Sequence, residues 1–290
     1  MTIVATFNEV TDRRPAPRPA ALDDLKLVEI TAGSPGHMIA SLAGRDEVHG
    51  TGADTVESLL KYRIGGEAFN RSCFAVQDDF AELQSAIYLH KDYAEVKSPR
   101  HLCGNVNNIL MGEARRTEGQ KPLSVIFYSI TRLGTMKGTG EILIGRLHKH
   151  LTEKYPGTVL STLSPLRQPK DRFGIDTYFS AVSPLPPEQM RAEEKRAFAL
   201  AFLTLKKEGV QNFHMGNGAT IGDIKVNADR IGTHRLMVNY IYSPDSAELR
   251  ANAVQYRNST GLDVLKLASP HLVQEARLLI TFSGLPKFTP

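Results

Sequence analysis

A strand, loop, helix and strand pattern near the middle of the chain constrains the fold more than any other feature. Residues 123–130 (LSVIFYSI) form an apolar, β-rich run that is typical of a buried central strand. A Gly/Thr-rich loop follows at 134–140 (GTMKGTG). Apolar residues then recur at helical spacing, at Leu143, Leu147 and Leu151. Because residues 158–163 again favour a strand, the pattern predicts a βαβ-like unit within an α/β fold.

The loop of such a unit lies at a helix N-terminus, where backbone N–H groups bind anions. Glycines at positions 138 and 140 let the backbone approach a phosphate closely. The loop matches neither a P-loop nor the GxGxxG dinucleotide pattern, and a purely structural turn explains the same glycines. The candidates for binding an anionic group are Lys137, Gly138, Thr139, Gly140 and Glu141.

The remaining pattern predicts further strands and helices on both sides of this unit. Expected strands cover residues 25–31, 73–76, 83–89, 212–220, 224–226 and 236–242. Expected helices cover residues 38–42, 55–62, 106–113, 184–207 and 247–258, and residues 273–282 favour a helix that runs into a terminal strand. The Pro/Arg/Ala-rich residues 1–22 are typical of a flexible tail, so we expect one domain over residues 23–290.

Composition excludes several classes of protein. With 41% hydrophobic residues over 290 positions, the chain can bury a sizeable core, but its longest apolar runs are too short to span a membrane. A net charge of +4 without a Lys/Arg run argues against nucleic-acid binding and fits a pocket for an anionic ligand or simple solubility. Two cysteines without metal-ligand spacing predict no disulfide framework and no metal site. A cytoplasmic location is expected because no secretory signal is present.

Three further features carry side chains that are suited to chemistry. Ser161 and Ser164 lie at the end of the strand that follows the loop and its helix, where hydroxyls would face the same cleft. His214 precedes the turn signal Asn217-Gly218 and could donate a proton. Asn239 and Tyr240 lie on the strand predicted at 236–242. Each feature taken singly is more typical of a structural role, as a turn, a satisfied buried histidine or a buried strand residue.

Together these segments resemble the malonyl-CoA decarboxylase family, in order and from about residue 23 to near the C-terminus. The resemblance is carried by VIFYSI (125–130), LSTLSPL (160–166), NFHMGNGA (212–219) and LMVNYIY (236–242). The segment at 212–219 is similar to the family's Phe-His-x-x-Asn-Gly-Ala motif, and with the strand that follows it this is a specific signal. The glycine loop by itself is not specific.

The resemblance implies a GNAT-like acyl-CoA-binding fold, with a mixed central sheet flanked by helices and coenzyme A phosphates held at the 137–141 loop. It implies decarboxylation of a malonyl or related dicarboxylic thioester, carried by Ser164 and His214, with Ser161 as a second candidate for the serine. Such a reaction needs no cofactor beyond the coenzyme A or phosphopantetheine of the substrate. Losing CO₂ leaves an enolate, which requires hydrogen-bond donors for its oxygen and a proton for its α-carbon.

The sequence also departs from the family pattern. We expect the family's N-terminal helical domain to be missing, because these 290 residues leave no room for it. No tryptophan is present, and Leu166-Arg167-Gln168-Pro169 replaces Ile-Pro-Gly-Phe after the Ser-Pro step. His234-Arg235 stands directly before Leu236, where the family has small residues. Possible substrate-binding residues are Ser161, Asn217, Arg235, Asn239 and Tyr240. For Arg167 and Arg235 two alternatives are open: they bind an extra anionic group of the substrate, or they contact no ligand.

Two partner classes, two activities and a third role, a non-catalytic acyl-CoA-binding or interaction module, stay open at this point. The acyl group could be carried on coenzyme A or on an acyl-carrier protein, and the chain could form a homo-oligomer. Because the GNAT fold more commonly transfers acyl groups to amines, an acyltransferase is the alternative, with Glu141, Asp229 or His214 as its base.

Overall fold

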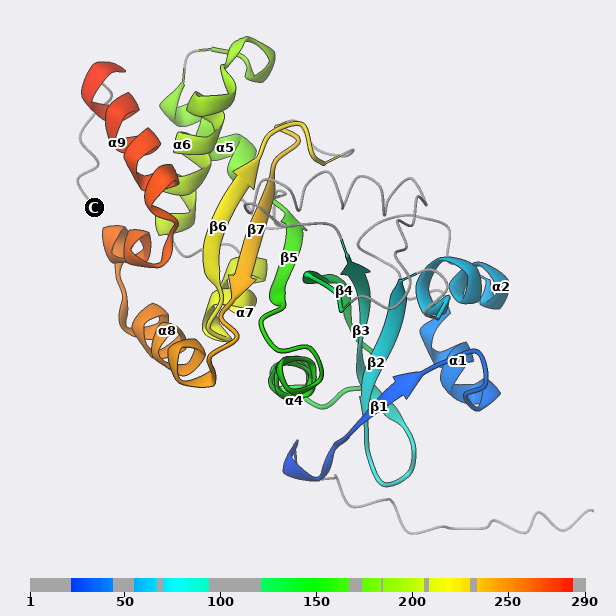
Figure 1. Ribbon diagram of the computed structural model, residues 1–290. Helices are drawn as coiled ribbons and strands as arrows, with labels where there is room; N and C mark the ends of the chain where they lie inside the picture. Colours follow the sequence, from blue (N-terminus) through cyan, green and yellow to red (C-terminus); the bar gives the residue numbers. More distant parts are fainter. Residues whose placement is uncertain are drawn as a thin grey trace, which may run out of the picture.

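The computed structural model describes residues 22–43, 55–66, 70–93, 121–166, 174–183, 185–205, 209–229 and 234–283. They build one seven-stranded sheet with the order β1-β2-β3-β4-β5-β7-β6 (Figure 1). The strands are β1 (Lys26–Ile30), β2 (Arg71–Gln77), β3 (Leu83–Asp92), β4 (Ser124–Arg132), β5 (Val159–Pro165), β6 (Thr220–Lys225) and β7 (Met237–Tyr242). Only β4 and β5 pair in parallel among these strands, so the sheet is mixed.

The parallel pair exists because helix α4 (Thr139–Lys154) crosses from the end of β4 to the start of β5. Its apolar residues Leu143, Leu147 and Leu151 are buried against the sheet. Gly138 caps the helix in a left-handed conformation, with φ of 82°, which a glycine adopts without steric cost. The predicted βαβ unit is therefore confirmed and forms the centre of the molecule.

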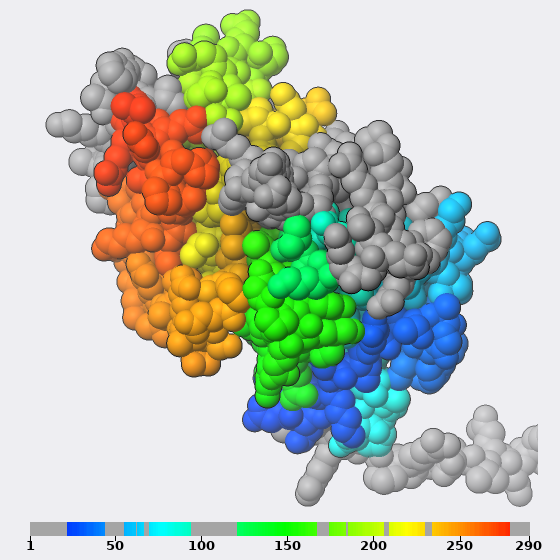
Figure 2. Space-filling model, viewed as in Figure 1, coloured from blue at the N-terminus to red at the C-terminus, as the bar shows by residue number. Residues whose placement is uncertain are grey.

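Helices cover the sheet at both of its ends. On the side of β1 and β2 lie η1 (Leu22–Asp24), α1 (Gly36–Leu42), α2 (Val56–Leu59) and η2 (Leu60–Ile64). The C-terminal half supplies α5 (Ile175–Val182), η4 (Pro187–Gln189), α6 (Ala192–Thr204), α7 (Gly209–Gly216), α8 (Ser246–Asn258), η5 (Gly261–Leu267) and α9 (Pro270–Ser283). Figure 2 shows the green β4–α4–β5 segment between the orange and red C-terminal helices and the blue N-terminal elements. The predicted α/β class, a mixed central sheet flanked by helices, is confirmed.

Two clusters of buried apolar side chains hold these layers together. The larger contains the inner face of α4 with α5, α6 and one face of the sheet, including Leu147, Phe127 and Phe202. The smaller lies under α1 and α2 and includes Met38 and Leu42. Burial of this size is the main source of stability in a chain of this length.

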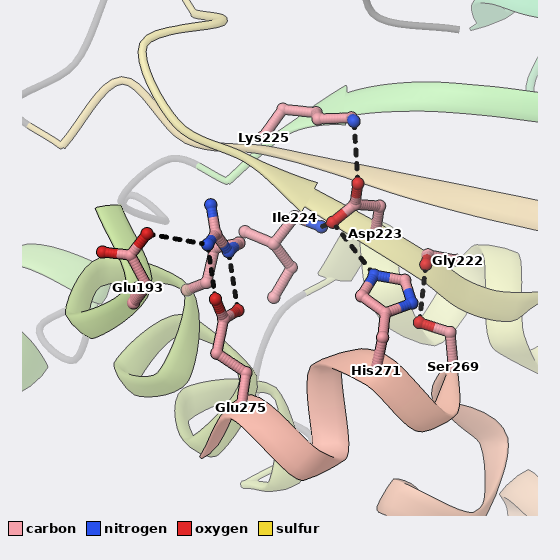
Figure 3. A network of polar contacts seen from close by, with 9 residues as sticks. Glu193, Gly222, Asp223, Ile224, Lys225, Ser269, His271 and Glu275 are labelled. Carbon is pink, nitrogen blue, oxygen red and sulfur yellow. Dashed lines mark hydrogen bonds and ion pairs between the residues drawn. The ribbon is translucent and has the colours of Figure 1, made fainter. Parts of the chain in front are cut away.

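A polar network attaches α9 to the edge strand β6 and to α6 (Figure 3). Asp223 on β6 contacts Lys225 at 2.7 Å and the His271 ring at 3.6 Å. Glu275 on α9 accepts two hydrogen bonds from Arg196 on α6, at 2.7 Å and 2.5 Å. These contacts fix the C-terminal helix on the side of the sheet formed by β6 and β7.

Several expected elements differ from the structure. Residues 212–220 were expected to form a strand, but 209–216 form helix α7 and the strand β6 begins only at Thr220. The terminal strand was also wrong, because α9 stays helical to Ser283. The helix expected at 184–207 begins at Ala192, since Pro187 starts a separate short 3₁₀ turn. Helix α5 was not predicted. The expected helix at 106–113 and residues 1–21 of the expected tail lie outside the described residues.

Candidate functional site

The strands β4 and β5 form a fork. Their parallel pairing ends at Phe127 and Thr162, although β4 continues to Arg132 and β5 to Pro165. Each arm stays in place because it pairs on its outer side, β4 with β3 and β5 with β7. The inner edges of the two arms therefore have no strand between them over the described residues.

A bulge in β4 marks the base of the fork. Leu89 of β3 pairs with Phe127, whereas the preceding residue, Tyr88, pairs with Ser129, so Tyr128 is the extra residue. Bulges bend a strand and increase its twist, which turns the upper arm of β4 away from β5.

A cavity of about 450 Å³ occupies the fork. Both arms, the glycine loop with the start of α4, and helix α7 contribute to its wall. The residues that line it are Ser85, Phe127–Ile130, Arg132, Lys137–Glu141, Thr162–Pro165, Gly209, Val210, Phe213 and His214.

Ser164 and His214 meet in this cavity. The Ser164 Oγ lies 3.2 Å from the His214 Nε2, and both side chains are buried. Ser164 comes from β5, whose alternation directs residues 162 and 164 to one face, and His214 comes from α7. The two residues lie 50 positions apart in the sequence, so only the packing of α7 beside β5 joins them.

The His214 ring is enclosed on its other sides by two tyrosines of β7. The Tyr242 hydroxyl lies 2.7 Å from the His214 Nδ1, and the Tyr240 ring stacks on the imidazole at 4.9 Å between centroids. Burial lowers the pKa of His214 to about 3, because the charged form is desolvated. Burial also raises the pKa of the Tyr242 hydroxyl well above its ordinary value. Near neutral pH both groups are therefore uncharged in the protein without ligand.

Thr162 closes the base of the fork. Its hydroxyl donates a hydrogen bond of 2.8 Å to the Phe127 carbonyl and lies 3.4 Å from the Ser164 Oγ. The backbone carbonyl of Thr162 in turn accepts a 3.0 Å hydrogen bond from the Asn239 side chain. These contacts fix both arms at the point where their pairing ends.

The glycine loop forms the second wall of the cavity, and all of its predicted residues, Lys137 to Glu141, line it. The Thr139 hydroxyl lies 2.6 Å from that of Ser85, which ties the start of α4 to β3. Lys137 and Arg132 line the same cavity with exposed side chains. A helix N-terminus that lines a cavity beside two cations favours binding of anionic groups.

Other predicted residues lie away from Ser164. Ser161 lies on the opposite face of β5, and its buried hydroxyl has no hydrogen-bond partner among the described residues. The exposed Arg235 donates to the Asp229 carbonyl at 3.0 Å and does not line the cavity. Asn239 and Tyr240 do not line the cavity. Asn239 contacts Thr162, and Tyr240 contacts His214, so both pack against residues of the site.

Asn217 lines a second cavity of about 410 Å³ instead. Its amide donates to the Phe213 carbonyl at 2.7 Å, which caps the end of α7. Only Glu141 and Phe213 line both cavities, so these two side chains separate them. The other residues of the second cavity are Asn212, Gly216, Tyr256 and Arg257.

Sequence reasoning missed two residues that contact the pair directly, Thr162 and Tyr242. Both lie inside the segments 160–166 and 236–242 that were singled out, but nothing in their spacing indicates contact with Ser164 or His214. Strand alternation could have indicated Thr162, because residues 162 and 164 of one strand point to the same face.

In the described ranges, no group of three His, Cys, Asp or Glu residues could hold a metal ion. Within the same ranges, none of the helices has the length and apolar character needed to cross a membrane.

No protein-family model and no curated protein matches the sequence. Solved structures of malonyl-CoA decarboxylases do match. Those from Rhodopseudomonas palustris, Agrobacterium vitis and Cupriavidus metallidurans share 17%, 20% and 20% identity, with TM-scores of 0.66, 0.62 and 0.60. Each match covers 88% of this chain, and the chain spans 63%, 67% and 68% of theirs. At this identity the matches show a shared fold, the one that the sequence motifs implied.

Proposed function

We propose that the protein is a decarboxylase of a malonyl or related dicarboxylic acyl thioester. The observation that carries this proposal is the buried Ser164–His214 pair, with 3.2 Å between Oγ and Nε2, in a cavity that also reaches the N-terminus of α4. The shared fold with malonyl-CoA decarboxylases supports the same reading.

The cavity suits the two ends of a thioester differently. At the loop, the N–H groups of the first turn of α4, with Lys137 and Arg132 beside them, would hold the phosphates of the carrier. Between the arms, the inner strand edges offer backbone groups to the amides of a pantetheine chain, as an added strand would. The thioester would then lie near Ser164, at the level where the strands part.

In the proposed reaction, the Ser164 hydroxyl donates a hydrogen bond to the substrate and holds the carboxylate so that its C–C bond aligns with the thioester π system. The bond breaks, CO₂ leaves, and its electron pair forms an enolate. The α-carbon then takes one proton from His214, so the overall change consumes one proton and yields an acetyl-type thioester and CO₂.

His214 must be charged when it donates this proton. Although burial keeps the free ring neutral, the substrate brings a carboxylate into the same cavity, and an opposite charge nearby raises the pKa of an imidazole. The proton therefore enters with substrate, and no metal or other cofactor is required by this chemistry.

The direct experiment incubates the full chain with malonyl, methylmalonyl and longer dicarboxylic thioesters, on coenzyme A and on a carrier protein. Mass spectrometry would detect the shortened thioester, and a coupled assay would detect CO₂. We expect turnover of at least one substrate and its loss in Ser164→Ala. A folded sample that releases CO₂ from none of them contradicts the proposal.

An acyltransferase is the alternative, and one observation favours it. Glu141 lines both cavities, so an amine in the second cavity could reach a thioester in the first with a carboxylate base between them. Transfer of the acyl group to an amine without CO₂ release would support this function. The other predicted base, Asp229, lines neither cavity.

A further inference from the structure

A continuous chain of hydrogen-bonding groups runs through the site. From one end it joins the Tyr242 hydroxyl to the His214 Nδ1 at 2.7 Å, and the His214 Nε2 to the Ser164 Oγ at 3.2 Å. It continues from Ser164 to the Thr162 hydroxyl at 3.4 Å and ends at the Phe127 carbonyl, 2.8 Å further on. All four side chains are buried; Thr162, Ser164 and His214 also line the cavity, whereas Tyr242 lies behind them and is fully enclosed, so water does not replace a missing partner of Tyr242 at little cost.

The carbonyl at the end of the chain determines the direction of every bond. A carbonyl only accepts, so Thr162 must use its single hydrogen there. Thr162 can then only accept from Ser164, which leaves the Ser164 oxygen to accept from the His214 Nε2. His214 accordingly carries its proton on Nε2, and its Nδ1 accepts from the Tyr242 hydroxyl.

The opposite direction leaves a buried donor without an acceptor. If His214 carried its proton on Nδ1, Tyr242 would accept it, and the Tyr242 hydrogen would have no acceptor among the described residues. Ser164 and Thr162 would also face each other with lone pairs. Buried donors are almost always satisfied, so the first direction is strongly favoured.

We propose that Thr162 and Tyr242 are positioning residues that hold the neutral His214 ring of the free protein, from its two sides, as the tautomer with the proton on Nε2. The assignment follows from the contacts alone. Its catalytic consequence rests on the decarboxylase function proposed above.

The consequence concerns the polarity of the Ser164–His214 pair. In a hydrolase the histidine accepts the serine proton and makes the oxygen a nucleophile. Here the histidine donates to the serine, so Ser164 keeps its hydrogen. The link from Ser164 to Thr162 is the longest in the chain, and the Ser164 hydroxyl can turn from it to a substrate oxygen while Nε2–H stays directed into the cavity.

The tautomer can be observed directly in the free protein. The full chain is labelled with ¹⁵N-histidine, and long-range ¹H–¹⁵N correlation spectra at pH 7 distinguish the two tautomers; the resonances of residue 214 are those missing from His214→Gln. We expect the pattern of a neutral ring protonated on Nε2. A ring protonated on Nδ1 overturns the proposal, whatever the activity.

Variants test the two positioning residues. Because either end imposes the same tautomer, Thr162→Val and Tyr242→Phe singly should retain Nε2–H with a loss of kcat of only several-fold. The double variant should show both tautomers, with kcat reduced about 100-fold and KM little changed. Thr162→Ser, which keeps the hydroxyl, should behave as the wild type. A folded double variant with the wild-type tautomer and kcat would refute the positioning role.

The two proposals fail in different ways. If spectra show Nε2–H but no thioester is decarboxylated, the proposed function is wrong and the tautomer assignment holds. If CO₂ is released by a protein whose His214 is protonated on Nδ1, the function holds and the positioning role is wrong.

Discussion

Gly140 at the start of α4 touches the ring of Phe213 in α7. A methyl group added at residue 140 would lie 2.9 Å from the Phe213 Cε2, closer than side-chain carbons normally approach. Since Phe213 precedes His214, this contact connects the anion-binding loop to the helix that carries the histidine. The glycine is thus needed for packing as well as for access to a phosphate.

Gly140→Ala should therefore displace α7 and lower kcat/KM for the thioester about tenfold. Gly145→Ala in the same helix is the matched control, because its added methyl group meets nothing within 4 Å. That control should leave activity unchanged and stabilise the protein by about 0.5–1 kcal/mol. Steady-state kinetics measure kcat/KM of the two variants, and thermal unfolding measures their stability. Equal kinetics in the two variants would show that the contact with Phe213 has no functional role.

Ser164→Ala and His214→Gln should each reduce kcat about 10²–10³-fold. Ser161→Ala provides the control from the same strand, since Ser161 lies on the opposite face and its hydroxyl has no partner among the described residues. Circular dichroism would establish that all three variants fold. If Ser161→Ala lost as much activity as Ser164→Ala, the assignment of the chemistry to the Ser164 face of β5 would be wrong.

Acid should destabilise the protein through buried histidines. Burial lowers the pKa of His214 to about 3, and burial with the nearby Arg71 lowers that of His90 to about 4. The unfolded chain binds these protons near pH 6.5, so stability is complete above that pH and falls as pH decreases towards the folded-state values. Each histidine should cost about 2 kcal/mol at pH 5.

Urea unfolding between pH 5 and 8 checks this prediction. In His214→Gln the difference in unfolding free energy between pH 5 and pH 8 should shrink by about 2 kcal/mol. A variant with the same pH dependence as the wild type would mean that the His214 ring is accessible to protons in the folded protein.

The Arg196–Glu275 pair should contribute to the attachment of α9. Two hydrogen bonds join the side chains. The exposed fraction is 19% for the Arg196 side chain and 22% for that of Glu275. A double-mutant cycle with Arg196→Met and Glu275→Gln should give a coupling energy of about 1–2 kcal/mol. In the Lys266–Asp263 pair the side chains are 67% and 48% exposed. A corresponding double-mutant cycle on this pair should give a coupling energy below about 0.5 kcal/mol. Equal coupling energies would argue that the partial burial of Arg196 has no effect. Since neither residue of the first pair lines the cavity, kcat should not change.

The sequence by itself determined the elements with strong periodicity. The apolar run before the glycine loop and the leucines spaced four residues apart after it predict β4 and α4, because a continuous apolar strand and a 3.6-residue repeat have few other solutions. The same local pattern placed Lys137 to Glu141 at a helix start. The segments with Ser164 and His214 were also identified from sequence, through motifs rather than through periodicity.

Only the tertiary structure decided how these residues meet. The short segment before Asn217 is too brief for its period to separate a strand from a helix, and packing of Gln211 and Met215 into the interior made it helical. The contact of Tyr242 with His214 joins residues 28 positions apart, and that of Thr162 with the Phe127 carbonyl joins residues 35 apart. Hydrogen bonds of this kind depend on which strands become neighbours and which face each side chain takes, and local sequence preferences do not encode that relationship.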